Sequence, residues 1–229
     1  MLWSPNTQLH YPFQNTALDY SGNARHGTVV GSGVYATKPN AGRCLYFDGT
    51  GDYVVTPSFG LSGTVVVFAA DVRCKIWFLD YQALYDDGPY SETPGANFLY
   101  LLRPTNTNDL ILRFFNGPAP QGTVTITNVF LAPGDDIWIP LVVAVDFSGK
   151  NVFCYRQGAL FASAAMTGTP VFPSTNRVKY LGTYNSTPVY PLTAGYLANV
   201  QLWTLATMPP AAQMLANANR LMLGMNPIW

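Results

Sequence analysis

The sequence predicts an all-β domain that ends in one short helix. The apolar, β-branched run at 64–72 is typical of a strand that is buried on both faces, and 137–147 holds another apolar run. Residues 45–57 place two β-rich segments around Gly-containing turn residues, a strong short-range signal for a β-hairpin. At 211–223, apolar residues recur at helical spacing. Since neither an internal repeat nor a linker interrupts the chain, we expect a single domain over 1–229.

The N-terminal part is expected to hold an edge strand, a loop and the hairpin. Residues 1–13 contain two prolines, which lack the N–H that a central strand would donate. A Gly- and Ser-rich loop follows at 19–33 and has room for a short strand at 27–30. In 45–57, the turn Asp48-Gly49-Thr50-Gly51 separates the two strands that we expect to pair with each other.

The remaining strands are expected where apolar runs are bounded by turn residues. They lie at 64–72, 75–85, 97–103, 109–115, 123–130, 137–147, 151–157, 160–164, 177–184 and 196–203. The segment 137–164 reads as a three-stranded meander, and 86–96 is the longest clear loop. Thr207 is the expected N-cap of the helix, so the helix and tail together occupy about 207–229.

Three sequence motifs carry a resemblance to a known family. Their residues are Asp19, Ser21, Gly22, Asn23 and Gly27; then Leu45, Phe47, Asp48, Gly49, Asp52, Tyr53 and Val54; and then Trp138, Val142, Asp146, Ser148, Gly149, Val152, Tyr155 and Gly158. Together they resemble the laminin-G-like or concanavalin-A-like jelly-roll domain over roughly 8–207. The resemblance implies an antiparallel jelly-roll β-sandwich, although fold alone does not settle function.

The C-terminal end carries a second, shorter resemblance. A helix followed by Asn226-Pro227-Ile228-Trp229 is similar to the ending of many jelly-roll proteins encoded in tailed-phage genomes. This resemblance implies a virion protein.

The composition excludes some partners and indicates assembly. Twelve Lys and Arg balance twelve Asp and Glu, and charged residues make up 10% of the chain, where about 25% is usual. No basic patch is present for nucleic acid, and no apolar run reaches the ~20 residues that span a bilayer. Such a sparsely charged surface is expected to be covered by other virion proteins or by self-association. The three cysteines lie in apolar runs and are expected to be free thiols.

Catalysis is not expected. Glycoside hydrolysis needs two carboxyl groups about 5–9.5 Å apart. The only glutamate is Glu92, and the adjacent acids Asp86-Asp87 and Asp135-Asp136 would point to opposite faces of a strand. The chain has two histidines and no Gly-x-Ser-x-Gly segment, so a hydrolase triad is not expected either.

A calcium site is weighed and not favoured, so we expect no cofactor. Many members of the family that the chain resembles bind Ca²⁺ through loop carboxylates, and Asp19 and Asp48 match acidic positions near that region. The family's last strand carries two acids where this chain has Ala198 and Asn199, which removes ligands that Ca²⁺ would need. We therefore favour turn-forming roles for Asp19 and Asp48.

Glycan binding is the ligand class that the loops favour, because a sugar site needs exposed aromatic rings beside polar groups. The candidates are Asp86, Asp87, Tyr90 and Glu92 in one loop, and Tyr184, Asn185 and Tyr190 in another. Tyr90 and Tyr190 stand beside prolines and could instead pack against a neighbouring subunit.

We therefore expect a non-enzymatic surface protein of a tailed-phage virion, either decorating the capsid or serving as a tail-associated adhesin for cell-surface polysaccharide. A purely structural cement protein is a second possibility. The alternative from another class is a secreted bacterial carbohydrate-binding module or degenerate glycosidase. The chain shows no basic and apolar leader, so we expect synthesis in the host cytoplasm and a place on the virion, or otherwise an extracellular one.

Overall fold

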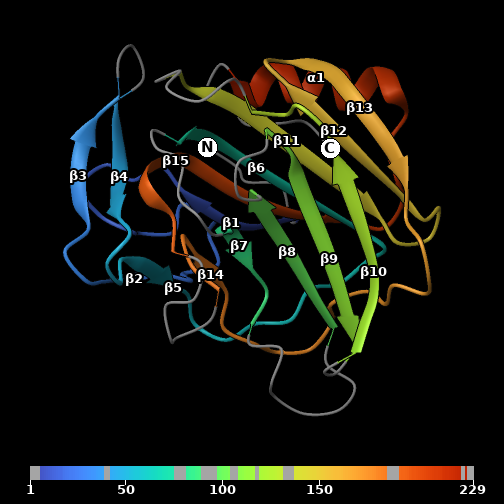
Figure 1. The fold of residues 1–229 in the computed structure, drawn as a ribbon, viewed down its shortest axis with the longest axis horizontal. Helices are drawn as coiled ribbons and strands as arrows, with labels where there is room; N and C mark the ends of the chain where they lie inside the picture. Colours follow the sequence, from blue (N-terminus) through green and yellow to red (C-terminus); the bar gives the residue numbers. More distant parts are fainter. Residues whose placement is uncertain are drawn as a thin grey trace.

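The chain folds into two antiparallel sheets stacked as a β-sandwich, as expected (Figure 1). The structure is a computed structural model. It describes residues 6–38, 42–74, 81–88, 97–103, 108–116, 119–130, 137–184, 191–222 and 225. Within these ranges, fifteen strands and one helix are present. The inner faces of both sheets meet in one core of aliphatic and aromatic side chains.

The larger sheet has eight strands in the described part of the chain, in the order β13-β12-β11-β6-β15-β4-β3, with β1 paired to β15. Its strands are β1 (Thr7–Tyr11), β3 (Val34–Thr37), β4 (Arg43–Asp48), β6 (Val65–Cys74), β11 (Ile139–Asp146), β12 (Asn151–Arg156), β13 (Ala159–Ala165) and β15 (Thr193–Leu205).

The smaller sheet has seven described strands in the order β10-β9-β8-β7-β14-β5-β2. They are β2 (Thr28–Val30), β5 (Tyr53–Val55), β7 (Gln82–Asp86), β8 (Asn97–Arg103), β9 (Leu110–Asn116), β10 (Ala119–Ile126) and β14 (Tyr180–Leu181). In Figure 1, β8, β9 and β10 lie in front of the larger sheet.

The helix α1 (Ala211–Met222) covers part of the outer face of the larger sheet, where it contacts β11 and β13. Met214 and Ala218 of α1 pack with Val67 and Trp203 in a second apolar cluster. The N–H of Met214 donates to the carbonyl of Pro210 at 3.0 Å, so the helix begins after Pro210 and later than the expected Thr207 cap. No helix in the described residues is long and apolar enough to cross a membrane.

Strand β6 confirms the prediction of a strand buried on both faces. Its residues alternate between the core of the sandwich, which Val66 and Phe68 enter, and the cluster beneath α1, which Val65 and Val67 enter. A strand covered on both sides needs no polar face, which explains the continuous apolar run in the sequence.

The predicted hairpin at 45–57 is wrong in its pairing. Its two strands exist as β4 and β5, but β4 pairs with β3 and β15, while β5 pairs with β2 and β14 in the other sheet. The Gly-containing turn is a corner between the sheets. The Asp52 carboxylate fastens this corner by accepting the backbone N–H groups of Ser32 at 2.6 Å and Asp48 at 3.0 Å.

The meander at 137–164 is confirmed as β11, β12 and β13, which pair in sequence order. Of the two expected closing strands, β15 is longer than predicted and β14 is shorter, with two residues. The three cysteines are free thiols: Cys44 and Cys154 are buried, and Cys74 is half-buried.

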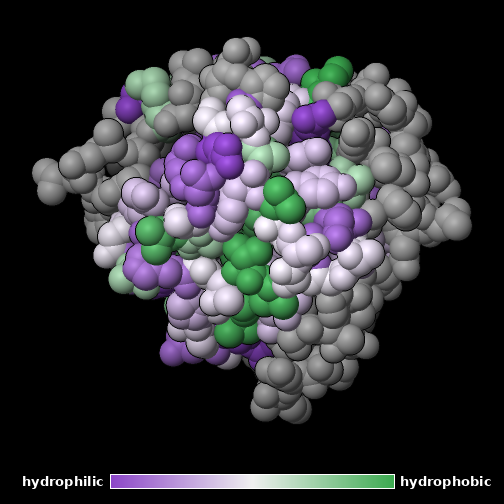
Figure 2. Space-filling model, turned by 90° about the vertical axis from the view of Figure 1, so that its left-hand side faces the viewer, coloured by the Kyte–Doolittle hydropathy of each residue, from purple (hydrophilic) through white to green (hydrophobic). Residues whose placement is uncertain are grey.

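An apolar strip marks the side of the molecule where the edge strands β2 and β3 lie. Figure 2 shows apolar side chains gathered there between polar neighbours. The valines of these strands include Val34, which is 57% exposed, and the half-buried Val29 and Val30.

Candidate functional site

Asp86 and Asp87 lie inside the protein. Both are 0% exposed. Asp87 pairs with Lys179, whose Nζ lies 2.6 Å from its carboxylate, and it also accepts the hydroxyl of Tyr85. Asp86 accepts the N–H of Gly88 at 3.1 Å. This corrects the expectation that these two carboxylates bind a glycan, because a ligand approaching from solvent cannot reach them.

Tyr184 is the predicted glycan-binding residue that the structure places near a surface, where it is half-buried. It joins a small apolar cluster of the smaller sheet, here called the Tyr184 face: Tyr81, Ala83, Ile111, Phe115 and Tyr184. The other predicted residues, Tyr90, Glu92, Asn185 and Tyr190, lie outside the described residues, so glycan binding by them stays a prediction.

Asp19 organises the loop that joins β1 to β2. Its carboxylate accepts four hydrogen bonds: from the backbone N–H groups of His10, Ser21 and Arg25 at 2.9 Å each, and from the Ser21 hydroxyl at 2.7 Å. The hydrogen bond from the N–H of Ser21, two residues after Asp19, forms an Asx turn, which is the turn-forming role expected for Asp19.

Asp48 also forms a turn. It accepts the backbone N–H and the hydroxyl of Thr50, both at 2.7 Å, and the hydroxyl of Ser32 at 3.0 Å. The hydrogen bonds from Thr50 hold the pKa of this carboxyl below its usual value. Across the described ranges, no group of three or more His, Cys, Asp or Glu side chains is placed to hold a metal ion.

The outer face of the larger sheet carries a row of aromatic side chains beyond the area that α1 covers. Strand pairing sets Tyr46 of β4 beside Tyr196 of β15, and Tyr196 beside Arg73 of β6. Trp138, directly before β11, continues the row. The ring centroids of Tyr46 and Tyr196 lie 4.8 Å apart, and those of Tyr196 and Trp138 lie 6.0 Å apart. The Arg73 guanidinium lies 4.8 Å from the Tyr196 ring centroid.

These four residues, Tyr46, Tyr196, Arg73 and Trp138, are called the aromatic row. All four are half-buried. Side chains alternate between the two faces of a strand, and the neighbours Leu45, Phe47 and Leu197 enter the core. The register of the sheet therefore places the row on the outer face, with Tyr46, Arg73 and Tyr196 in strands and Trp138 directly before one.

An ion pair runs alongside the aromatic row. Lys38, which follows β3, places its Nζ 2.7 Å from Asp71 Oδ2 and 5.1 Å from the centre of the Trp138 ring. Lys38 is 9% exposed and Asp71 is 5% exposed. Burial raises the pKa of the Asp71 carboxyl, and the hydrogen bond from Lys38 acts in the opposite direction.

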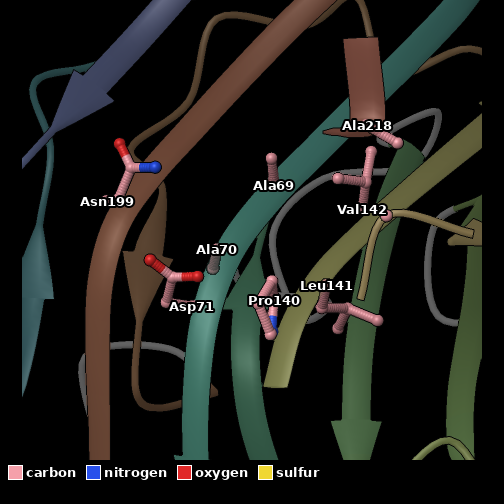
Figure 3. Close-up of a pocket in the computed structure, with 9 residues that line it drawn as sticks. Ala69, Ala70, Asp71, Pro140, Leu141, Val142, Asn199 and Ala218 are labelled. Atoms are coloured by element: carbon pink, nitrogen blue, oxygen red, sulfur yellow. The ribbon is translucent and has the colours of Figure 1, made fainter. Parts of the chain in front are cut away.

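A small pocket continues the same face between this ion pair and α1. Asp71 and Asn199 lie on one side of it, while Ala69, Val142 and Ala218 lie on the other (Figure 3). Its volume is about 10 Å³, which is room for about one water molecule and far below the roughly 300–1,000 Å³ of pockets that hold a whole small ligand.

A bulge in β15 brings Asn199 to this pocket. The pairing of β15 with β6 shifts between Ala198 and Gln201, and Asn199 has a φ of 49°, a conformation that Asn adopts more readily than most residues. Its Oδ1 accepts the side-chain amide of Gln201 at 3.0 Å and lies 3.0 Å from Nε2 of His10. Asn199 thus has a structural role in the bulge of β15.

The sequence interpretation missed the aromatic row. From the sequence, Trp138 belongs to the third motif of the family resemblance, and Tyr46 and Tyr196 are ordinary residues of expected strands. Alternation within 45–47, where Leu45 and Phe47 are apolar, could have placed Tyr46 on the outer face. No sequence signal marks the pocket, because it depends on the bulge and on where α1 docks.

No protein-family model matches the chain, and no curated protein matches its sequence. Solved structures do match its fold. Domain 4 of AbnA, a GH43 extracellular arabinanase from Geobacillus stearothermophilus, solved in complex with arabinotriose, superposes with a TM-score of 0.69 at 18% identity. The match covers 95% of this chain and 98% of that domain. The chain shares this β-sandwich architecture.

Two botulinum neurotoxin structures are also similar. The serotype C1 binding domain gives a TM-score of 0.68 at 14% identity, over 94% of this chain and 52% of that one. The binding domain of neurotoxin DC, in complex with SialylT, gives 0.65 at 12% identity, over 95% and 52%. The chain therefore spans about half the length of these toxin domains, and at these identities the likeness shows the fold alone.

Proposed function

We propose that this chain is a non-enzymatic glycan-binding protein that holds sugar rings on the aromatic row. The observation that carries the proposal is the row itself: three half-buried aromatic rings and an arginine, side by side on a sheet face beyond the area that α1 covers. Aromatic faces cover the apolar face of a sugar ring, while the Arg73 guanidinium and the Asp71 carboxylate supply hydrogen bonds.

The placement of the row suits recognition. Its residues lie in strands or directly beside one. Their backbone is therefore fixed before a ligand binds, and little conformational entropy is lost on binding. The area covered by α1 borders the row on the same face, so the proposed sugar chain would lie across β4, β15, β6 and the start of β11.

The fold neighbours support the same ligand class. The arabinanase domain was solved with arabinotriose, and cell entry of botulinum neurotoxin type C depends on interaction with two ganglioside molecules. These ligands belong to those proteins. What they support here is that β-sandwiches of this architecture occur in carbohydrate-binding proteins.

We place the protein on the surface of a tailed-phage virion, where many copies would multiply modest affinities. The helix and Asn-Pro-Ile-Trp ending, the low charge and the apolar strip at β2 and β3 support a chain held among other virion proteins or its own copies. The alternative, a secreted bacterial carbohydrate-binding module, is supported by the likeness to an extracellular arabinanase domain. Recovery of the native protein with purified particles, or free in culture medium, separates the two settings.

Binding without hydrolysis is the second part of the proposal. Asp86 and Asp87 are enclosed, and Asp146 accepts hydrogen bonds from Ser148 and Gly149 in a turn. These placements support structural roles for the carboxylates. We expect no release of reducing sugar from any polysaccharide that the protein binds.

Alanine substitution in the aromatic row is expected to abolish most glycan binding. On a glycan array probed with the protein clustered on beads, Trp138→Ala or Tyr196→Ala should weaken binding at least about tenfold, because each removes a stacking surface. Tyr184→Ala tests the Tyr184 face, and Tyr20→Ala is the matched control, since Tyr20 is 46% exposed and lies outside the aromatic row. Both should bind as the wild type does. A loss confined to Tyr184→Ala would move the site to the smaller sheet, and no binding to any glycan would refute the proposed function.

Glycan binding is expected to be unchanged by a calcium chelator, because no cofactor is part of the proposed site. Asp19 and Asp48 are engaged in turns, as described above, and neither belongs to the aromatic row. The measurement is the same array in calcium and again in EDTA. Binding that disappears in EDTA and returns with added calcium would contradict this prediction.

A further inference from the structure

We propose that the apolar strip at β2 and β3 is the contact surface of a homodimer, in which a two-fold axis along the normal of the larger sheet relates a second copy of this chain to the first (Figure 2). The dimer itself does not depend on glycan binding. What the dimer would do for glycan binding rests on the proposed function.

The strip lies where the sandwich is incompletely closed. Val29 of β2 and Tyr35 of β3 pack against the core from the two sheets, yet both are only half-buried. Val34, next to Tyr35, is 57% exposed. At the other side of the sandwich, β10 and β13 are in contact, and beyond them the Thr169 hydroxyl donates to Gln121 Oε1 at 3.2 Å. A second copy on the strip would complete the burial of these core side chains.

The charges near the strip stand at its two ends. Neither β2 nor β3 contains a charged residue. Where β3 ends, Arg43 of β4 pairs with Thr37 and its guanidinium donates to the Thr37 hydroxyl at 3.5 Å. Before β3 begins, the Asp48 carboxylate accepts the hydroxyl of Ser32 at 3.0 Å. The strip therefore has one basic end and one acidic end.

The other ionised groups at these ends leave the pattern in place. Lys38 at the basic end is paired with Asp71, and Asp52 at the acidic end is 1% exposed. Arg43 and Asp48 are each half-buried, and no ion pair joins either of them to another described residue. They are therefore the charges that a partner meets at the rim of the strip.

These charges select the symmetry of the dimer. A two-fold axis between copies that meet at this side lies either nearer to the strand direction or nearer to the sheet normal. An axis along the strands sets Arg43 against Arg43 of the partner subunit, and like charges repel. An axis along the normal reverses the strand direction, so that Arg43 of each copy faces Asp48 of the partner subunit. The same favourable contact then occurs twice.

This axis places both aromatic rows on one face of the dimer, because a rotation about the normal keeps the outer faces of the two larger sheets on the same side. Val34 and Tyr46 are strand-pairing partners, so the row begins one strand away from the strip. One dimer would therefore present two neighbouring glycan sites to the same polysaccharide, which raises the affinity for a surface that carries many copies of it.

The first test is the mass of the full chain in solution, measured by sedimentation equilibrium from about 1 to about 100 μM. The wild type is expected to reach twice the 25.0 kDa of one chain. Val34→Lys should remain monomeric, because it would bury an unpaired charge in the contact. Val171→Lys is the matched control, since Val171 is 45% exposed outside the strip, and it should dimerise as the wild type does.

A wild type that stays monomeric over this range would overturn the inference. A folded Val34→Lys variant that dimerises like the wild type would also overturn it. Neither result depends on a sugar, so the glycan array still tests the proposed function separately.

Two charge reversals test the axis. Arg43→Glu and Asp48→Lys, each alone, set like charges against each other at both contacts and should weaken the dimer at least about tenfold. An equimolar mixture of the two variants should recover dimers of wild-type strength, because both contacts of the mixed dimer join opposite charges. Melting temperatures verify that both variants fold. A mixture that dimerises no better than its components would contradict the axis along the sheet normal.

Discussion

Asp87→Asn is expected to lower the free energy of unfolding by about 3–5 kcal/mol at pH 8. Asp87 and Lys179 are both 0% exposed, and each is the other's ion-pair partner. Burial raises the pKa of the Asp87 carboxyl to about 6, with the Lys179 charge opposing that rise, so at pH 8 the carboxyl is ionised. The asparagine leaves the Lys179 ammonium buried without a counter-charge.

Lys179 is fixed by more than the ion pair. Its Nζ donates to the carbonyl of Phe59 at 2.7 Å and lies 4.7 Å from the centre of the Phe59 ring. The ammonium therefore cannot leave for solvent without breaking the contact between β14 and the segment that follows β5. Retention of an unpaired charge, rather than its relocation, is the expected cause of the destabilisation.

A double-mutant cycle separates the charge from the packing. Lys179→Met alone should cost about as much as Asp87→Asn, whereas the double variant should cost at least about 1 kcal/mol less than the sum, because neither charge is then left alone. Asp48→Asn is the matched control, since it makes the same chemical change in an exposed turn where Asn is also tolerated. The measurement is urea unfolding at pH 8. Strictly additive losses, or a loss in Asp87→Asn no larger than in Asp48→Asn, would contradict the role given to the pair.

Trp203→Ala is expected to lower the free energy of unfolding by about 3–5 kcal/mol. Trp203 is 0% exposed on β15, where its ring lies in the cluster between the larger sheet and α1. Its indole N–H donates to Gln201 Oε1 at 3.1 Å. The alanine would open a cavity beneath the helix and leave a buried amide oxygen without this donor.

The same substitution should loosen the site, because Ala218 of the loosened helix is also a wall of the pocket. Leu215→Ala is the control on α1, since Leu215 is 41% exposed, and it should change stability by less than about 1 kcal/mol. Thermal and urea unfolding measure both effects, and hydrogen exchange of the α1 amides reports helix docking. A Trp203→Ala variant that unfolds like the wild type would show that α1 does not depend on this cluster.

Local patterns in the sequence predict the elements well and their pairing less well. The apolar run of β6, the meander β11–β13 and the C-terminal helix follow from periodicity, because each is decided by which faces are buried. The Gly-rich turn after β4 has the composition of a hairpin. It nevertheless joins two sheets, because pairing partners far along the chain complete both of its strands. Composition does not encode that choice.

The candidate site was less accessible to sequence reasoning than the fold. Asp87 stands in a Gly- and Pro-rich segment that reads as a loop. It is buried as the ion-pair partner of Lys179, which lies 92 residues later in the sequence. The aromatic row joins residues from β4, β6, β15 and the start of β11, so no contiguous motif contains it. Strand alternation predicts that Tyr46 points outward. Its neighbours in the row, Tyr196 and Arg73, can be known only from the order of the strands in the sheet.

The most direct test of glycan binding on the aromatic row is to follow the indole N–H of Trp138 by ¹⁵N–¹H NMR during a titration with a glycan found on the array. In the structure this N–H is enclosed and has no hydrogen-bond partner among the described residues, which makes it a sensitive reporter of a ligand at the row. Trp138→Phe assigns its resonance. The account predicts that this signal and the backbone amides of Arg73 and Tyr196 shift together in proportion to occupancy, while amides of the Tyr184 face stay in place. Shifts confined to the Tyr184 face, with the Trp138 indole unmoved at saturation, would contradict it.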